Sequence, residues 1–485
     1  MRFTRTYLGI CLLTCVIVLI GYQLNPWHEA YFSYHDVTQP ARIEQFAKNL
    51  RSFQFPTSAP DMNWGVGYPI FTFYAPTAYW ITTALHIGGL SISQSINASF
   101  LLAMIVAGWG MYTLTLDSFK SKQIAFVSAL LYSSSPWVAV EIFVRGNLAE
   151  MWFIALLPWA WVVIRRAQIM TFAVVALSLA LTSHNVLSPV LFGWTLIYAI
   201  FQNEKRTVIL KIIGLASLMS AYFWIPFIAD IGKTYASEVA RLTDYRDHFL
   251  CLSQLWTGMW GYGGSAPGCI ADGQSFMIGK LQILFGVGGM LLYLRHVYIQ
   301  KRAQWFELML MIVLLGSVWL TLPISQWFWQ IVSPLQSFQF PWRFILFALF
   351  SLSYFAGYLI KICSKSRVLP ILTVIIAITL FIQSDRFFNG VFRSRSDAQQ
   401  FHSTSYIREV AAYKVPEYLP RTVDRTLWLN MGKIKPSESQ IAELKRQYTG
   451  YKPSLMLYTI SRFISIATLL CLLCLTRFTA TRKRA

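Results

Sequence analysis

The chain consists of long apolar runs separated by short polar connectors, the pattern of a protein that crosses a bilayer many times. Most runs approach the roughly 20 residues that an α-helix needs to span the hydrocarbon layer. We place the spans at residues 7–23, 97–116, 123–140, 151–167, 169–183, 186–202, 207–229, 276–296, 305–322, 341–361, 368–385 and 455–475. Because backbone groups inside a bilayer must be hydrogen-bonded within their own segment, the pattern predicts an all-α polytopic membrane protein with about twelve transmembrane helices.

Residues 69–90 form one further apolar stretch that is long enough to be a span. A span there would invert every later helix and turn the basic connectors outward, so we interpret this stretch as interfacial or re-entrant. The first apolar run follows Arg2 and Arg5, as in a signal peptide, but lacks a small-residue cleavage site. We therefore expect that run to remain as a membrane anchor.

Charge indicates the orientation of the bundle. Only 13% of the 485 residues are charged, and the formal net charge is +20. In a soluble protein such a charge would suggest nucleic acid, but here the basic residues mark orientation and predict no nucleic-acid partner. Twelve spans place both termini on the face of the basic connectors, which we expect to be cytoplasmic. These connectors carry Lys120 and Lys122, Arg165 and Arg166, Lys205 and Arg206, Arg295, Lys301 and Arg302, and Lys361, Lys365 and Arg367.

The opposite face receives the long loops, which are the candidate functional segments. They are residues 24–96, 141–150, 230–275, 323–340 and 386–454. We divide the chain into a membrane domain at 1–385, a small outward insert at 386–454, and a last span with a basic tail at 455–485. Cys251 and Cys269 share loop 230–275, where an oxidising compartment would allow a disulfide between them.

The first outward loop holds an ionisable pair beside a segment rich in Gly, Pro and aromatic residues. His35-Asp36 follows the first span after a short connector, and Arg42 begins a helical stretch. The loop continues with Asn63-Trp64-Gly65-Val66-Gly67-Tyr68-Pro69 and Phe71-Thr72-Phe73-Tyr74-Ala75-Pro76. An ionisable pair at a membrane face suggests chemistry on a substrate that arrives from the lipid.

Further ionisable residues occupy the outward ends of later spans. Arg145-Gly146 and Glu150 fall in a brief connector, His184 joins two short spans, and Arg343 begins another. Structural roles stay open for each of them. Glu150 can cap a helix, His184 can be a satisfied interfacial residue, and Arg343 can extend toward the membrane surface.

Sugar transfer from a lipid phosphate would use such a set of residues. The reaction needs a carboxylate base that activates the acceptor hydroxyl, and cations that hold the leaving phosphate. Asp36 can supply the base, with His35 tuning or orienting it. Arg343, joined by Arg145 and His184, can form the cationic cradle. The aromatic loop 63–76 can stack on a sugar ring and exclude water.

The motifs together resemble the GT-C superfamily of polyprenyl-phosphate-sugar-dependent glycosyltransferases over nearly the whole chain. Within it they are similar to a bacterial group labelled 6-pyruvoyl-tetrahydropterin-synthase-related membrane protein. The motifs are His35-Asp36, Trp64-Gly65-Val66-Gly67-Tyr68-Pro69, Phe73-Tyr74-Ala75-Pro76, Arg145-Gly146 with Glu150, Phe340-Pro341-Trp342-Arg343-Phe344 and Glu417-Tyr418-Leu419-Pro420. The sequence offers no three-histidine zinc site of the kind that pterin chemistry would need.

The resemblance implies a GT-C-like bundle in the bacterial inner membrane, with its active site on the periplasmic face. It implies an inverting transfer from an undecaprenyl-type phosphate sugar to a glycan, lipid or protein acceptor. Asp36 would be the general base, Glu150 a second acidic participant, and Arg343 a contact of the donor phosphate. The other substrate-binding candidates are Arg42, Trp64, Tyr68, Tyr74, Arg145, His184, Gln339 and Tyr418.

Two questions stay open at this stage. Some GT-C enzymes resemble oligosaccharyltransferase in holding a divalent metal, so Mg²⁺ or Mn²⁺ between Asp36 and Glu150 is an alternative to a metal-free site. The alternative function is a lipid-linked sugar flippase, although transporters tend to carry polar residues near mid-membrane and to show paired halves. A scaffold without catalysis would not need Asp36 and Arg343 on one face.

Overall fold

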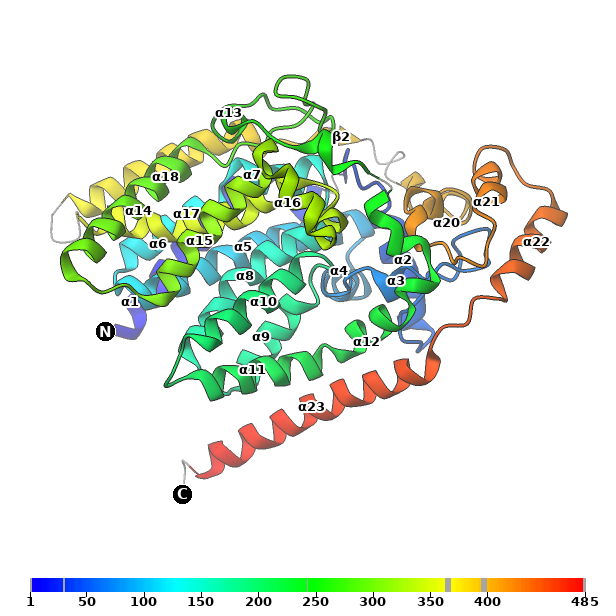
Figure 1. Ribbon diagram of the computed structural model, residues 1–485, viewed down its shortest axis with the longest axis horizontal. Helices are drawn as coiled ribbons and strands as arrows, with labels where there is room; N and C mark the ends of the chain where they lie inside the picture. The colour runs from blue at the N-terminus through cyan, green and yellow to red at the C-terminus, as the bar shows by residue number, and fades with distance from the viewer. Residues whose placement is uncertain (1, 29–30, 242, 363–367, 394–398, 483–485) are drawn as a thin grey trace.

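The computed structural model describes residues 2–28, 31–241, 243–362, 368–393 and 399–482 (Figure 1). The basic connector at 363–367 and residues 394–398 of the insert lie outside the described residues. Helices dominate the described chain. Its two strands are short, and β1 (Tyr31–Phe32) pairs antiparallel with β2 (Phe392–Arg393). The all-α fold predicted from the apolar runs is confirmed.

Six described helices are long and apolar enough to cross a membrane, and three bent helix pairs would raise this number to nine. The apolar parts of α1 (Arg2–Ile20), α9 (Thr171–Leu181) and α10 (Leu187–Ile200) are shorter. The predicted apolar runs fall on helices, but the number of twelve spans is not confirmed. The six long helices are α5 (Ile92–Phe119), α8 (Leu148–Arg166), α14 (Lys280–Gln300), α17 (Ile345–Lys361) with the turn before it, α18 (Leu369–Phe387) and α23 (Leu455–Arg482).

Breaks interrupt three of the apolar stretches. The first lies between α6 (Lys122–Ser133) and α7 (Pro136–Ala139), where the chain bends by 43° and continues in a π-helical turn. The other two are a 66° bend between α11 (Arg206–Met219) and α12 (Ala221–Asp230), and a 95° bend between α15 (Trp305–Thr321) and α16 (Gln326–Ile331). The spans predicted at 123–140 and 207–229 therefore fall on bent helix pairs and not on single straight helices. At the first break Pro136 has no backbone N–H to continue the helical ladder.

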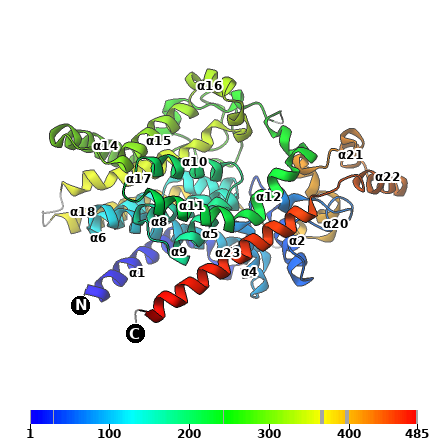
Figure 2. The same ribbon diagram turned by 60° about the horizontal axis from the view of Figure 1, so that its bottom comes forward.

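The central helices α5, α8 and α17 bury most of their side chains, whereas α14, α18 and α23 bury only a minority of theirs. Figures 1 and 2 show α23 along the outside of the bundle, beside α11 and α12. Both termini lie at one end of the molecule, and the insert lies at the other. Which end faces the cytoplasm stays a prediction. The insert contains α20 (Thr404–Glu409), α21 (Arg425–Met431) and α22 (Glu438–Tyr448).

The apolar stretch 69–90 forms two short helices, α3 (Ile70–Phe73) and α4 (Thr77–Ile87). The 11 residues of α4 extend over only about 16 Å, half of the hydrocarbon thickness. Pro76 separates the two helices. These lengths agree with an interfacial or re-entrant segment and argue against a complete span.

The insert is fastened to the bundle at both ends. At its start β2 pairs with β1 of the first loop. At its end the carboxylate of Asp230, on α12, accepts hydrogen bonds from the backbone N–H and the hydroxyl of Ser454, at 2.9 and 2.7 Å, and from Tyr458 Oη at 2.6 Å. Lys233 Nζ lies 2.7 Å from the same carboxylate. These partners compensate the charge of a fully buried side chain.

Candidate active site

A cavity of about 550 Å³ lies between the first loop, the connector before α8, loop 230–275, the start of α17 and the insert. It brings together most of the residues that the sequence selected. Glu150 lies beneath the cavity wall, and Trp64 and Tyr68 do not line the cavity. The selected residues that line it are His35, Asp36, Arg42, Tyr74, Arg145, His184, Gln339, Arg343 and Tyr418.

The loop that carries Asp36 pairs with the connector that carries Arg145. The N–H of Asp36 donates to the carbonyl of Arg145 at 3.1 Å. The next residue, Gly146, has φ +61°, and a Cβ there would lie 2.4 to 2.8 Å from atoms of the Tyr34 side chain. Both the conformation and the space therefore require glycine. This is why Arg145-Gly146 brings the two loops so close together.

A ring of polar side chains orients the Asp36 carboxylate. Oδ1 accepts from Thr38 Oγ1 at 2.7 Å, and Oδ2 accepts from Gln39 Nε2 at 3.0 Å and Arg42 Nη1 at 2.9 Å. The Tyr79 hydroxyl accepts from Arg42 at 3.0 Å and donates to Gln39 Oε1 at 3.0 Å. The Asp36 side chain is 22% exposed, while that of Arg42 is 2% exposed. Arg42 lines the cavity and its contacts orient Asp36, while its predicted contact with substrate stays a prediction.

Glu150 anchors the cationic side chains from below. Its Oε2 accepts from Arg145 Nη1 at 2.7 Å and from Asn147 Nδ2 at 3.1 Å. The same oxygen lies 3.6 Å from Arg343 Nε and 3.8 Å from His184 Nε2. Glu150 is fully buried in the first turn of α8, and its N–H donates to Asn147, the N-cap residue. Glu150 does not line the cavity, and its contacts position the neighbouring side chains; its predicted catalytic role stays a prediction.

Two arginines form the cationic wall of the cavity. Arg145 also pairs with Glu141, a fully buried carboxylate that the sequence analysis missed. Its guanidinium lies 4.6 Å from the centre of the Trp342 ring. Arg343 Nη1 donates to the carbonyl of Phe338 at 2.7 Å. Carboxylates, a carbonyl and an aromatic ring therefore fix both guanidinium groups, so that they can receive an anion without reorganising.

His184 is neutral, which corrects its predicted place in a cationic cradle. Its Nδ1 accepts hydrogen bonds from the N–H groups of Val186 and Leu187, at 3.2 and 3.3 Å. These bonds assign the proton to Nε2, which faces Glu150. Burial lowers the pKa of His184 to about 3. The ring can donate a hydrogen bond but carries no positive charge at neutral pH.

His35 contacts loop 230–275 and has no described hydrogen bond to Asp36. Its Nε2 lies 3.0 Å from the carbonyl oxygen of Tyr262. Burial lowers the pKa of His35, and the contact with Tyr262 offsets part of this effect. The prediction that His35 tunes the carboxylate of Asp36 is therefore replaced by a contact that fastens a second loop over the cavity.

Trp64 and Tyr68 hold the insert in place. Trp64 Nε1 donates to Tyr413 Oη at 2.9 Å, and the Tyr68 hydroxyl donates to the carbonyl of Val415 at 2.6 Å. Both side chains are buried and lie outside the cavity lining. The predicted stacking of these rings on a sugar is therefore corrected. Tyr74, from the same loop, does line the cavity and lies against Arg42.

The insert and loop 230–275 add cavity residues that the sequence analysis did not select. Glu417 lines the wall, and burial raises its pKa to about 7. Its signal was the Glu417-Tyr418 motif, from which only the tyrosine was chosen. Gln274, Ser265 and His248 also line the cavity. Their signal was only that they lie in an outward loop.

The donor set does not fit a metal shared by Asp36 and Glu150. The oxygens of Asp36 accept from Thr38, Gln39 and Arg42, and Oε2 of Glu150 accepts from Arg145. Among the described residues, no group of three or more His, Cys, Asp or Glu side chains could hold a metal ion. Arginine donors on both carboxylates disfavour a bound cation. No step below depends on a metal.

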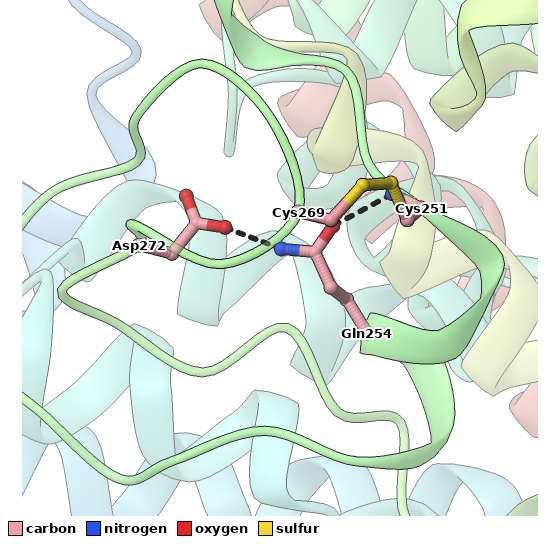
Figure 3. The surroundings of a disulfide bond; sticks show 4 residues. All are labelled: Cys251, Gln254, Cys269 and Asp272. Carbon is pink, nitrogen blue, oxygen red and sulfur yellow. Dashed lines mark hydrogen bonds between the residues drawn. A yellow bond between two sulfur atoms is a disulfide. The ribbon is translucent and has the colours of Figure 1, made fainter.

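A disulfide joins Cys251 and Cys269, the two cysteines that the sequence paired (Figure 3). Between them Gln254 accepts a hydrogen bond from the N–H of Cys251 at 2.6 Å and donates to the Asp272 carboxylate. Asp272 also accepts from the N–H of Ala266 at 2.8 Å. The covalent bond and these hydrogen bonds fix the part of loop 230–275 that reaches the cavity.

Comparison with known proteins adds a family match. Residues 71–267 match the model of the 6-pyruvoyl-tetrahydropterin synthase related domain, a membrane protein. This is the group that the sequence motifs resembled. The matched segment contains Tyr74, Arg145 and His184, whereas Asp36 and Arg343 lie outside it. No curated protein matches the chain.

Two solved structures are similar to the chain. Arabinofuranosyltransferase AftD from Mycobacteria is 13% identical, with a TM-score of 0.41, over 78% of this chain and 27% of that protein. This chain thus spans about a quarter of its length. ArnT from Cupriavidus metallidurans, bound to undecaprenyl phosphate, is 12% identical, with a TM-score of 0.37, over 96% of this chain and 76% of that protein. At these identities the likeness concerns the fold alone.

Proposed function

We propose that the protein is an inverting membrane glycosyltransferase, which moves a sugar from a polyprenyl-phosphate donor to an acceptor on the periplasmic face. One observation carries the proposal: the polar cavity with its carboxylate and two arginines adjoins an apolar groove. The groove, of about 490 Å³, shares six lining residues with the cavity: Asn185, Val186, Val239, Ser337, Glu417 and Tyr418. An amphipathic ligand with an anionic head and a hydrocarbon tail matches this combination.

The groove offers the tail an apolar path. It is lined by Pro189 and Val190 of α10, Phe227 of α12, and Leu335 and Phe338 before α17. A tail there would place its phosphate near Arg145 and Arg343, whose guanidinium groups bind phosphate oxygens. The two arginines would then neutralise the charge that develops on the leaving phosphate.

The carboxylate of Asp36 would take the proton of the acceptor hydroxyl. The hydroxyl oxygen then attacks the anomeric carbon as the bond between this carbon and the phosphate oxygen breaks. The proton remains on Asp36 and polyprenyl phosphate leaves, so that a single displacement inverts the anomeric configuration. Gln39 and Arg42 both bind Oδ2, which leaves Oδ1, with the Thr38 hydroxyl as its one strong partner, as the proton acceptor.

The test is sugar transfer in proteoliposomes from a panel of radiolabelled polyprenyl-phosphate sugars, comparing the unmodified protein with Asp36→Asn. We expect a loss of about 10²- to 10⁴-fold in kcat, the usual contribution of a general base. Donor affinity should be retained, because the amide is nearly isosteric. Absence of transfer from every donor, with lipid-linked sugar crossing the bilayer instead, would favour the flippase.

A further inference from the structure

The cavity has a neutral polar wall, formed by a tight hairpin of loop 230–275. Tyr262 and Gln274 form an antiparallel bridge, and the N–H of Gly263 donates to the carbonyl of Gly273 at 2.7 Å. A Cβ on Gly261 would lie 2.5 Å from the same carbonyl oxygen. The two chain segments therefore approach more closely than larger residues would allow. We call residues 261–274 the hairpin.

The hairpin is anchored on three sides. The disulfide and the contact between Gln254 and Asp272 fix its outer part (Figure 3). Tyr262 Oη donates to the carbonyl of Asn389 at 2.5 Å, next to the end of α18. The carbonyl of Tyr262 receives the His35 contact. Because these anchors come from separate parts of the chain, the hairpin is a fixed wall rather than a mobile lid.

The hairpin presents uncharged hydrogen-bonding groups to the cavity. Gln274 is 3% exposed and lines the cavity, and its Oε1 has no hydrogen-bond partner among the described residues. Ser265 Oγ lies 2.8 Å from His248 Nδ1 and 3.3 Å from Trp342 Nε1. Burial lowers the pKa of His248, so this ring is neutral at pH 7.

This wall continues from the cationic wall. The Trp342 ring lies against the Arg145 guanidinium on one side, and its N–H reaches Ser265 on the other. A group bound at the hairpin would therefore be next to a group bound by Arg145. In a phosphate-linked sugar, the hydroxyl groups of the ring are likewise adjacent to the phosphate.

We propose that the hairpin is the subsite that recognises the sugar of the donor, with Gln274 and Ser265 binding its hydroxyl groups. The proposal rests on the function proposed above and names the part of the site that selects the sugar. A buried carbonyl without a partner is costly, and a sugar hydroxyl that donates to Gln274 would remove this cost. A neutral wall also favours neutral hydroxyls over charged substituents. The selected donor is therefore an uncharged sugar with a hydroxyl donor toward Oε1.

The test compares Gln274→Leu and Ser265→Ala with the unmodified protein on the donor panel. When a sugar hydroxyl loses its buried hydrogen-bond partner in the protein, kcat/KM falls by about 10- to 100-fold. We expect this loss for the preferred donor and a smaller loss for a donor lacking that hydroxyl, so the preference between the two narrows. Gln274→Glu keeps an oxygen acceptor and should recover part of the activity. Ser275→Ala is the matched control, since Ser275 is buried on the same segment but does not line the cavity.

Binding measurements separate this proposal from the proposed function. The affinities of glycosylated and bare polyprenyl phosphate are measured for each variant by tryptophan fluorescence in detergent. We expect Gln274→Leu to lower the affinity for the glycosylated lipid about 10-fold or more. The affinity for the bare lipid should not change. An equal loss of affinity for both lipids, or no loss for either, would overturn the proposal that the hairpin is a sugar subsite. Selective loss of sugar binding in a protein that transfers no sugar would keep the subsite and reject the transferase.

Discussion

Arg42 donates from Nη1 to Oδ2 of Asp36 at 2.9 Å, while its own side chain is almost completely buried. The arginine lines the cavity and also holds the carboxylate in place. Tyr79 and Gln39 complete the same ring. This arrangement holds Oδ2 of Asp36 with two donors and leaves Oδ1 with the Thr38 hydroxyl as its one strong partner.

Replacing Arg42 tests this ring. Arg42→Met should lower kcat at least 10-fold, because a loosely held base is poorly aligned, and destabilise the fold by about 1–3 kcal/mol. KM for the donor should change little. Lys48→Met is the control, since Lys48 pairs with Asp61 at 2.6 Å on the exposed surface and should cost about 1 kcal/mol or less. A KM effect that exceeds the kcat effect would instead make Arg42 a substrate contact.

Glu417 predicts a pH dependence of stability. Its pKa is raised by burial to about 7, from an ordinary value of 4.5. Between these values the folded state holds a proton that the unfolded state has lost, so the free energy of unfolding falls as pH rises from about 4.5 to 7. Glu417→Gln should remove about 1–3 kcal/mol of that fall. Thermal unfolding in detergent at pH 5 and pH 8 measures it, and an unchanged slope in the variant would contradict the prediction.

The disulfide predicts sensitivity to reduction. Opening Cys251–Cys269 releases a loop with a sequence separation of 18, which should cost up to about 3 kcal/mol and loosen the hairpin. We expect a reducing agent, or the double change Cys251→Ser and Cys269→Ser, to lower transfer at least about 10-fold. The control changes Cys471 and Cys474 to Ser, both exposed and free. Full activity after verified reduction would show that the loop holds its shape without the bond.

Gly146 predicts a steric requirement beside the base. Gly146→Ala would introduce a Cβ against Tyr34 at a positive φ, so we expect destabilisation of about 2–4 kcal/mol and loss of transfer. The control is Gly214→Ala in α11, where a Cβ meets nothing within 4 Å and stability should rise slightly. Unfolding midpoints of both variants give the comparison. Similar midpoints would contradict the close approach of the two loops.

Tyr68 distinguishes packing from sugar binding. Tyr68→Phe removes the hydroxyl that donates to Val415 and should cost about 1–2 kcal/mol. Because the ring lies outside the cavity lining, KM for the donor should stay within about twofold. A large rise in KM without loss of stability would restore the stacking role predicted from sequence.

Helix positions could be predicted from sequence because apolar runs and basic connectors are local properties. The bends could not, since Pro136 permits a break without setting its angle, and the 66° bend at Ser220 has no proline at the break itself. Asp36, Arg145 and Arg343 were found for a related reason. Arg343 begins an apolar run, Arg145 lies in a brief connector, and Asp36 follows the first run after a connector. Loops and helix ends on the same face of a bundle are brought together.

Other parts of the site depend on contacts that sequence spacing does not encode. His184 was assigned a charge, but its burial, which depends on packing, keeps it neutral. Trp64 has the composition of a sugar-stacking residue, yet Tyr413, 349 residues away, accepts its N–H. Gln274 had no signal beyond its place in an outward loop. Its importance follows from a hairpin held by a disulfide and by residues from other loops.

Because the insert is fastened at both of its ends, the parts of the cavity come together in a fixed order as the chain is synthesised. One end pairs with the strand just before Asp36, and the other meets Asp230 through Ser454 and Tyr458. A nascent chain that has emerged through α18 already carries Asp36 and both arginines, but still lacks the wall with Glu417 and Tyr418. The cavity is therefore enclosed last, when the final helix docks. Under the proposed function, a partly synthesised molecule in the membrane would hold its reacting groups without the enclosure that lets them act.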